Sequence, residues 1–238
     1  MPGIAAAQDS TDIGVALPAA KPYAIKLWQV GAVVGIGVLS MAVVDEPVQQ
    51  WVTNPEHRSG SVEGIANTTQ RFGQVEVVVP VTAGIIIAGL VTSNQALFHS
   101  GLRIGASVAV ASLVTGVAKY ALGVESPSQT DEPADFDPLS GSASMWSGHT
   151  ALAFSFATSL SQELHRPWAT AGLYTLATAT ALSRVYQNDH WVSDVMIGAA
   201  VGVASAKLAT GRWTIFGLRA PVPLATPNGV GLMWHGTF

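Results

Sequence analysis

Three ionisable residues stand close together in the stretch SRVYQNDHWVSD, residues 183–194, just ahead of a strongly apolar run. His190 and Asp194 are four residues apart and share one helical face if a helix begins near His190. A carboxylate there fixes the imidazole tautomer, so the other ring nitrogen can act as a nucleophile. Arg184 adds a fork of N–H donors for the oxygens of an anion. This set suits attack on phosphorus, although an aromatic-flanked helix start with a solvated first-turn acid explains it equally well.

A second candidate motif is SMWSGHT, residues 144–150, which leads into another apolar segment. Gly148 lets backbone N–H groups approach a ligand closely, and the start of a helix is a ready anion site. Ser147 precedes that start, and His149 at its edge could protonate a departing oxygen as a general acid. The alternative is an N-cap serine followed by a surface histidine, which is a common arrangement.

Lys119 is the third candidate, because it lies at the end of an apolar segment in GVAKYALGVESP. A lysine in such a position is costly unless its ammonium reaches the interface or finds an anionic partner. A bound phosphate would be such a partner, and reaching the interface would explain the residue as well. The other histidines have no comparable neighbours in the sequence and are predicted to be bystanders: His57, His99, His165 and His235.

The elements that must position these residues are predicted to be helices of a membrane bundle. Of the 238 residues, 49% are hydrophobic and only 11% are charged, against roughly 25% charged in a soluble domain. Four of the apolar segments are rich in small residues, which suit close helix packing in a membrane. The interior of a soluble helical bundle would favour them too. The expected fold is all-α, a six-helix transmembrane bundle with segments at about 27–44, 75–92, 102–122, 149–162, 168–184 and 192–209.

Composition also excludes several kinds of function. The chain has no cysteine, so disulfides, thiolate metal sites and a cysteine nucleophile are excluded. The net charge of −4 gives no reason to expect a nucleic-acid partner. No group of residues has the spacing of metal ligands. The oligomeric state cannot be predicted from these features.

The distribution of charge predicts the orientation in the membrane. With a cytoplasmic N-terminus and six alternating helices, most acidic residues fall outside, and Lys119 and Arg184 lie there with them. This asymmetry follows the positive-inside rule. It predicts a multi-pass protein of a bacterial inner membrane whose site faces the periplasm, with a soluble periplasmic protein as the alternative. Seven of the 11 cations then lie inside: Lys21, Lys26, Arg103, Arg166, Lys207, Arg212 and Arg219.

The chain divides into three parts. Residues 1–21 lack the charged start and apolar core of a signal peptide and are predicted to be a flexible N-terminal segment. Residues 22–210 form the helical membrane domain, with a short interfacial helix expected between the first two spans. Residues 211–238 form a tail in which PNG is a turn signal, so a β-hairpin is possible.

Taken in order, the three motifs resemble those of the type-2 phosphatidic acid phosphatase family. That family shares its fold with bacterial non-specific acid phosphatases and vanadium haloperoxidases, and its pattern is K-x6-R-P, then P-S-G-H, then S-R-x5-H-x3-D. The third motif matches in full, and the resemblance covers roughly residues 22–210. Two positions depart from the pattern, because Ser126 stands in place of the first-motif arginine and Trp146 in place of the second-motif proline.

The loss of the arginine bears on the rate. A serine donates one neutral hydrogen bond where arginine gives a charged, often bidentate contact. Loss of one preorganised donor costs on the order of 10²–10³ in rate. Three outcomes are open. The site works more slowly, Arg58 or Arg71 supplies the missing charge, or the site no longer turns over substrate.

The resemblance implies a metal-independent hydrolase without cofactors that acts on a lipid phosphate or pyrophosphate at the membrane. By this resemblance His190 attacks phosphorus to form a phosphohistidine, and Asp194 orients it. His149 protonates the leaving oxygen and then activates water. A catalytically impaired phospholipid-binding membrane protein and a vanadate-dependent halide oxidase are the alternatives. The residues expected to hold the phosphoryl oxygens are Lys119, Ser147, Gly148, Arg184 and Ser126.

Overall fold

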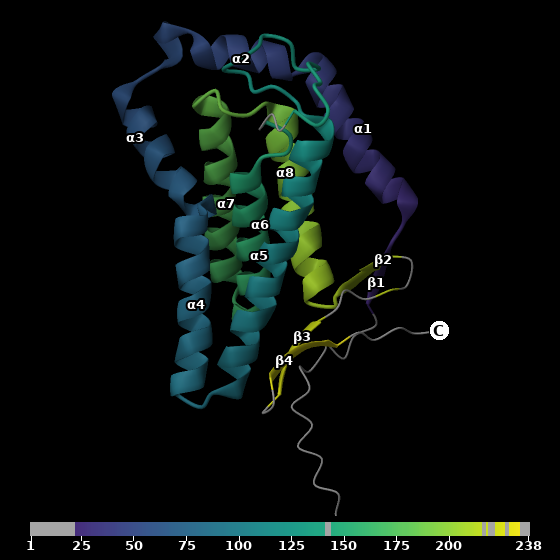
Figure 1. Cartoon of the computed structure of the whole chain (residues 1–238). Helices are drawn as coiled ribbons and strands as arrows, with labels where there is room; N and C mark the ends of the chain where they lie inside the picture. The colour runs from purple at the N-terminus through teal and green to yellow at the C-terminus, as the bar shows by residue number, and fades with distance from the viewer. Residues whose placement is uncertain (1–21, 141–143, 216–217, 219–221, 227–228, 234–238) are drawn as a thin grey trace, which may run out of the picture.

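The computed structural model describes residues 22–140, 144–215, 218, 222–226 and 229–233, and they form mainly a bundle of helices (Figure 1). Helix α6 (Gly148–Leu164) is central, because it packs against α5 (Gln95–Leu122), α7 (Pro167–Tyr186) and α8 (Val192–Ala209). Ten of its 17 residues are buried, most of them Ala, Ser or Thr. The small side chains that the sequence places in this segment therefore face other helices.

Glycines of α8 allow its close packing against α6. A Cβ atom at Gly202 would lie 2.4 Å from the carbonyl oxygen of Ala151, and one at Gly198 would lie 2.8 Å from that of Ser147. Both distances are far below van der Waals contact, so only glycine permits this approach. The contact at Gly198 fixes the start of α6 against the first turns of α8.

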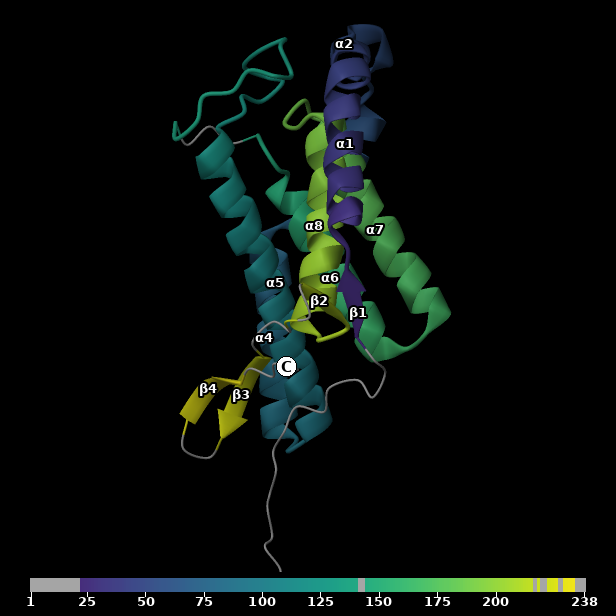
Figure 2. The same cartoon turned by 90° about the vertical axis from the view of Figure 1, so that its right-hand side faces the viewer.

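The N-terminal half of the chain wraps the outside of this core. Helix α1 (Leu27–Val43) lies along α8 (Figure 2) and bends by 52° into α2 (Asp45–Thr53), which crosses the end of the bundle. After η1 (Pro55–His57), α3 (Gly60–Thr69) runs beside α7 and continues through η2 (Gln70–Gly73) into α4 (Val75–Val91). The six predicted apolar segments correspond to α1 and to α4 through α8. The region predicted to hold one interfacial helix contains both α2 and α3.

The outer helices expose apolar surface that suits a membrane. Trp28 and Leu39 of α1 are 67% and 63% exposed, and α4 likewise presents exposed valine and isoleucine side chains. Surfaces of this kind are rare on soluble monomers. The fold is thus the predicted transmembrane helical bundle rather than the soluble alternative.

Fewer than six segments of the described chain meet the criterion for a membrane span. Helices α5 and α8 are each long and apolar enough to cross a membrane, and the bent pairs of α1 with α2 and of α3 and η2 with α4 each pass as one span. Among the described residues four spans at most meet this criterion, so the count of six stays a prediction. Helix α6 does not meet the criterion for a span. It has only 17 residues, and many of its buried side chains are small and polar.

Short strands complete the described chain. Strand β1 (Tyr23–Ile25) pairs in parallel with β2 (Trp213–Ile215), which joins the tail to the start of α1. Strand β3 (Val222–Thr226) pairs antiparallel with β4 (Gly229–Met233). The predicted turn at residues 227–228 and the predicted flexible segment 1–21 lie outside the described residues.

Alternating helix directions bring four helix ends together. Helices α5 and α7 end where α6 and α8 begin, at the end of the bundle crossed by α2 (Figure 1). Lys119 and Arg184 lie in the last turns of α5 and α7, and His149 and Asp194 lie in the first turns of α6 and α8. The predicted site residues therefore meet, although they come from distant parts of the sequence.

Candidate active site

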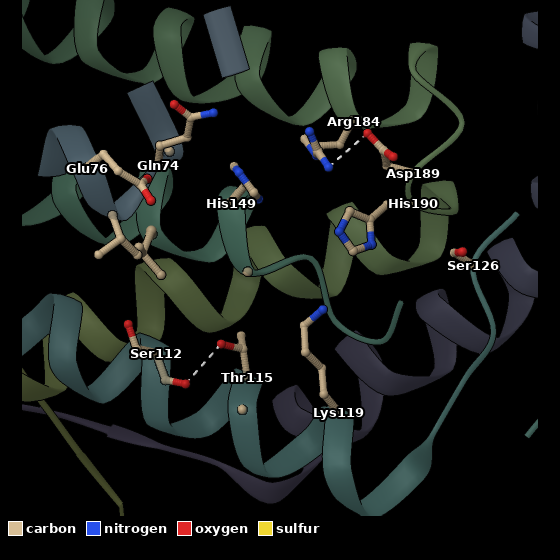
Figure 3. A pocket seen from close by; sticks show the side chains of 15 residues that line it. Gln74, Glu76, Ser112, Thr115, Lys119, Ser126, His149, Arg184, Asp189 and His190 are labelled. Carbon is tan, nitrogen blue, oxygen red and sulfur yellow. Dashed lines mark hydrogen bonds and ion pairs between the residues drawn. The ribbon is translucent and has the colours of Figure 1, made fainter. Parts of the chain in front are cut away.

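A cavity of about 680 Å³ opens between the ends of these helices (Figure 3). Its lining includes residues of α5, α6 and α7, the connection from α7 to α8, and the first turn of α4. Ser147 and Asp194 are not part of the lining. The other six of the eight predicted site residues are: His190, His149, Lys119, Gly148, Arg184 and Ser126.

His190 lies in the short connection between α7 and α8 and is 7% exposed. Its Nδ1 faces Asp194, with 3.6 Å between Nδ1 and Oδ2. This distance is longer than a hydrogen bond by a few tenths of an ångström. Asp194 is 1% exposed, and its Oδ2 accepts hydrogen bonds from Ser144 Oγ at 2.5 Å and Trp191 N at 3.2 Å. The fixed carboxylate beside Nδ1 leaves Nε2, across the ring, for the cavity.

The charge state of His190 follows from its surroundings. Burial lowers the pKa of His190 below its ordinary value of 6.5, and the carboxylate of Asp194 opposes this shift. The charges of Lys119 and Arg184 lower the pKa further. The imidazole is therefore neutral at neutral pH, as a nitrogen nucleophile must be.

Arg184 is held in place by polar neighbours on three sides. Its Nη1 donates to Gln70 Oε1 at 2.5 Å and to Gln187 Oε1 at 3.2 Å, while Nη2 pairs with Asp189 Oδ2 at 2.8 Å. Its buried Nε has no hydrogen-bond partner among the described residues. The guanidinium is thus oriented in the cavity wall before any ligand binds, and a carboxylate already covers one of its edges (Figure 3).

The start of α6 places Gly148 and His149 in the cavity wall, but the hydroxyl of Ser147 serves the helix. Ser147 Oγ accepts hydrogen bonds from the backbone N of Thr150 at 3.4 Å and from Thr150 Oγ1 at 3.0 Å, and the residue is fully buried. This is the N-cap arrangement that the sequence left open as the alternative. Phosphate binding by Ser147 stays a prediction that its placement does not favour.

Ser126 lies at the mouth of the cavity, in the loop after α5. Its hydroxyl donates to Gln129 Oε1 at 2.6 Å, so it is engaged within its own loop. Arg58 pairs with Glu63 at 2.7 Å and lies over the ring of Tyr186. Neither Arg58 nor Arg71 is in the lining, so the cavity wall takes two cationic side chains from the described chain, Lys119 and Arg184.

Asp45, at the start of α2, is a buried residue next to the site that the sequence analysis missed. It is 1% exposed, and its carboxylate accepts from Ser193 N at 2.9 Å and from Ser193 Oγ at 2.5 Å. The N-cap residue Trp191 makes no side-chain cap on α8. The carboxylate of a different helix therefore caps the helix that carries Asp194, and it does so three residues from His190. No sequence signal connects Asp45 to a serine 148 positions away.

We expect the Asp45→Ala variant to unfold earlier and to lose part of its kcat. Both Ser193 donors would be left buried without an acceptor, which costs about 1–3 kcal/mol for each donor. The loosened start of α8 would also shift Asp194 relative to His190. Thermal unfolding in detergent and kcat on any accepted substrate measure the two effects.

Glu46→Ala is the matched control for this prediction, because Glu46 is the exposed neighbour and accepts a hydrogen bond from Gln50 within α2. Equal unfolding temperatures for the two variants would show that the Asp45–Ser193 contact contributes nothing.

These features define a class of protein: a helical membrane bundle with a cavity lined by histidines and cations at one end. Comparison with known families narrows the class of protein: residues 100–214 match the model of the PAP2 superfamily. This match confirms the family resemblance of the motifs. The replacement of an arginine by Ser126 is not tested by this match.

Individual relatives agree with this assignment. A segment of 69 residues is 46% identical to a lipid A 1-phosphatase of Porphyromonas gingivalis, covering 28% of this chain and 15% of that protein. The structure of LpxE of Aquifex aeolicus aligns with a TM-score of 0.55 at 19% identity, over 70% of this chain and 94% of that one. A transmembrane PAP2-type phosphatidylglycerolphosphate phosphatase from Bacillus subtilis aligns with a TM-score of 0.59 at 22% identity, over 76% and 93%. At these identities the two structures bear on the fold alone.

Proposed function

We propose that this protein is a metal-independent phosphatase that hydrolyses a lipid phosphate through a phosphohistidine intermediate. The observation that carries the proposal is His190 itself: a buried, neutral imidazole with a fixed carboxylate at Nδ1, facing a cavity that holds two cations and a second histidine. A nucleophile, an orienting acid, a proton donor and compensating charge are the parts that phosphoryl transfer needs.

In the first step, Nε2 of His190 attacks phosphorus. The N–P bond forms, the bond from phosphorus to the leaving oxygen breaks, and the imidazolium form of His149 gives that oxygen a proton and becomes neutral. In the second step, His149 removes a proton from water, which attacks phosphorus and breaks the N–P bond. Inorganic phosphate leaves, and His190 is again neutral. Lys119 and Arg184 stabilise the negative charge on the phosphoryl oxygens in both steps.

A lipid substrate fits the surroundings of the cavity. The cavity lining includes Val75 of α4, which is exposed, and α5 carries exposed apolar side chains at Leu113 and Val117. Acyl or prenyl chains could lie against this surface while the phosphate enters between the helix ends. The match to a lipid A 1-phosphatase supports the same class of substrate. The excess of cations on the opposite side of the predicted bundle supports a site at the periplasmic face of a bacterial inner membrane.

The second candidate function is that of a phospholipid-binding membrane protein with impaired catalysis. The placement of Ser126 favours it, because the serine hydroxyl is bonded to Gln129 and brings no positive charge to the cavity. A site with two cations could bind a phosphate and still stabilise the transition state poorly.

The test is phosphate release from phosphatidate, phosphatidylglycerol phosphate and a polyprenyl diphosphate, each in EDTA, by the wild type and by Ser126→Arg. We expect release from at least one lipid by the wild type. We expect an increase of about 10²-fold in Ser126→Arg, since the added guanidinium restores a charged donor. Lipid binding without release by the wild type would favour the second function. Release that depends entirely on added metal would contradict the proposed mechanism.

A further inference from the structure

The cavity has two chemically different halves. Lys119, Arg184 and His190 gather on one side of His149, and Gln74 and Glu76 from the start of α4 lie on the other (Figure 3). Among the described residues that line the cavity, both cations are in the first half. The second half offers a carboxylate and an amide, together with the polar face of α5 at Ser112 and Thr115.

The course of the proposed reaction assigns these halves to different parts of the substrate. In an in-line displacement the attacking and leaving atoms lie on opposite sides of phosphorus. His190 approaches from the cationic half, and His149, the proton donor to the leaving oxygen, stands between the halves. The group attached to that oxygen must therefore extend toward Gln74 and Glu76.

The chemistry of the second half restricts what that group can be. A carboxylate only accepts hydrogen bonds, and the Gln74 amide both donates and accepts. Gln74 makes no capping bond to α4, and the hydroxyl of Thr115 donates to Ala111 O at 2.9 Å, which leaves it an acceptor. Hydroxyl groups satisfy such partners, because each one can donate to Glu76 or Thr115. A second phosphate would instead be repelled by the carboxylate.

We propose that Glu76 and Gln74 form a leaving-group subsite for lipid phosphates whose esterified carbon neighbours a free hydroxyl, as in a glycerol or sugar headgroup. The inference rests on the proposed phosphatase function and narrows its substrate class. Polyprenyl diphosphates, whose leaving group carries a second phosphate, are then poor substrates. Phosphatidate, whose leaving group has no free hydroxyl, lies between the two.

The sharpest test uses a matched pair of substrates: phosphatidylglycerol phosphate and its analogue that lacks the 2′-hydroxyl of the headgroup. Both lipids carry the same charges, so only the hydroxyl differs. We expect the wild type to prefer the hydroxylated lipid in kcat/KM by about tenfold, as for one hydrogen bond to a charged acceptor. In Glu76→Gln this ratio should fall toward one, and the relative rate on a polyprenyl diphosphate should rise.

Glu56→Gln is the control variant, because it removes the same charge from an exposed position in η1 that is not in the cavity lining. It should keep the wild-type ratios. Glu76 in the first turn of α4 could instead serve only the helix dipole. Glu76→Gln would then lower the unfolding temperature with unchanged ratios, which would overturn the subsite.

A protein without phosphatase activity would give a result that differs from the failure of the subsite. If the wild type releases no phosphate from either lipid, the proposed function fails, and competition binding of the same pair still tests the subsite. Tighter binding of the hydroxylated lipid by the wild type, but not by Glu76→Gln, would support the subsite. Equal binding of the two lipids by the wild type would overturn it.

Discussion

The His190→Ala variant is expected to release no measurable phosphate while the protein stays folded. Removing a nucleophile costs on the order of 10⁵-fold or more in kcat when no other group can replace it. The fold should survive because Nδ1 of His190 has no hydrogen-bond partner in the described structure, so its removal strands no buried donor. Asp194 keeps its bonds to Ser144 and Trp191 in the variant. Phosphate release and thermal unfolding in detergent are the measurements.

Alkaline-quench trapping of a labelled phosphoenzyme identifies the nucleophile directly. The wild type should yield an acid-labile phosphohistidine, and His190→Ala should yield none. A trapped intermediate that persists in the variant would show that another residue attacks phosphorus.

The pH dependence of the wild type follows from the same residue. Because burial lowers the pKa of His190, the ring stays neutral and active as the pH falls past 6.5, the ordinary value. Activity should decline only when the pH passes through the lower pKa of the folded protein and the ring becomes charged. An acidic limb of kcat/KM that is centred above 6.5 would contradict this reading.

The spacing within residues 183–194 predicted that His190 and Asp194 lie together, because their contact depends on local geometry at the start of one helix. The apolar segments predicted the helices for a similar reason. Their alternating directions then brought Lys119, Arg184 and His149 to one end of the bundle. Local sequence pattern was therefore sufficient to predict which residues meet in most of the candidate site.

The sequence pattern could not predict contacts between residues that are distant in the sequence. Asp45 caps α8 across 148 positions, and Ser144 bonds Asp194 across 50. An isolated acid or serine near an apolar run carries no sign of such a partner. Ser147 is a different case. Its motif suggested phosphate binding, but its hydroxyl caps the start of α6, as serine often does at helix N-termini.

Helix α6 is not among the helices that meet the length and hydropathy criterion for a span, and this bears on function. The helix is buried by other helices rather than by lipid, so small polar residues replace the large apolar ones of a lipid-facing span. Its central position is what holds Gly148 and His149 rigidly against α8. A helix that does not meet the span criterion thus carries the proton donor of the proposed reaction.

The His149→Ala variant is expected to discriminate between leaving groups. An alkoxide is too basic to leave without a proton, so the first turnover on an alkyl phosphate should slow by about 10²–10⁴. An aryl oxide leaves readily, and its first turnover should slow much less. The second step still lacks its base, so the aryl substrate should give a burst of one equivalent of phenol followed by slow release of phosphate. Rapid-mixing measurements on both substrates resolve the two phases.

His57→Ala is the control, because His57 stacks on Trp51 and is not in the cavity lining. It should behave as the wild type on both substrates. A His149→Ala variant that loses the same factor on alkyl and aryl phosphates, without a burst, would contradict proton donation by His149. In that case the imidazole would contribute to binding the phosphoryl group, and the acid of the first step would have to be another residue of the cavity.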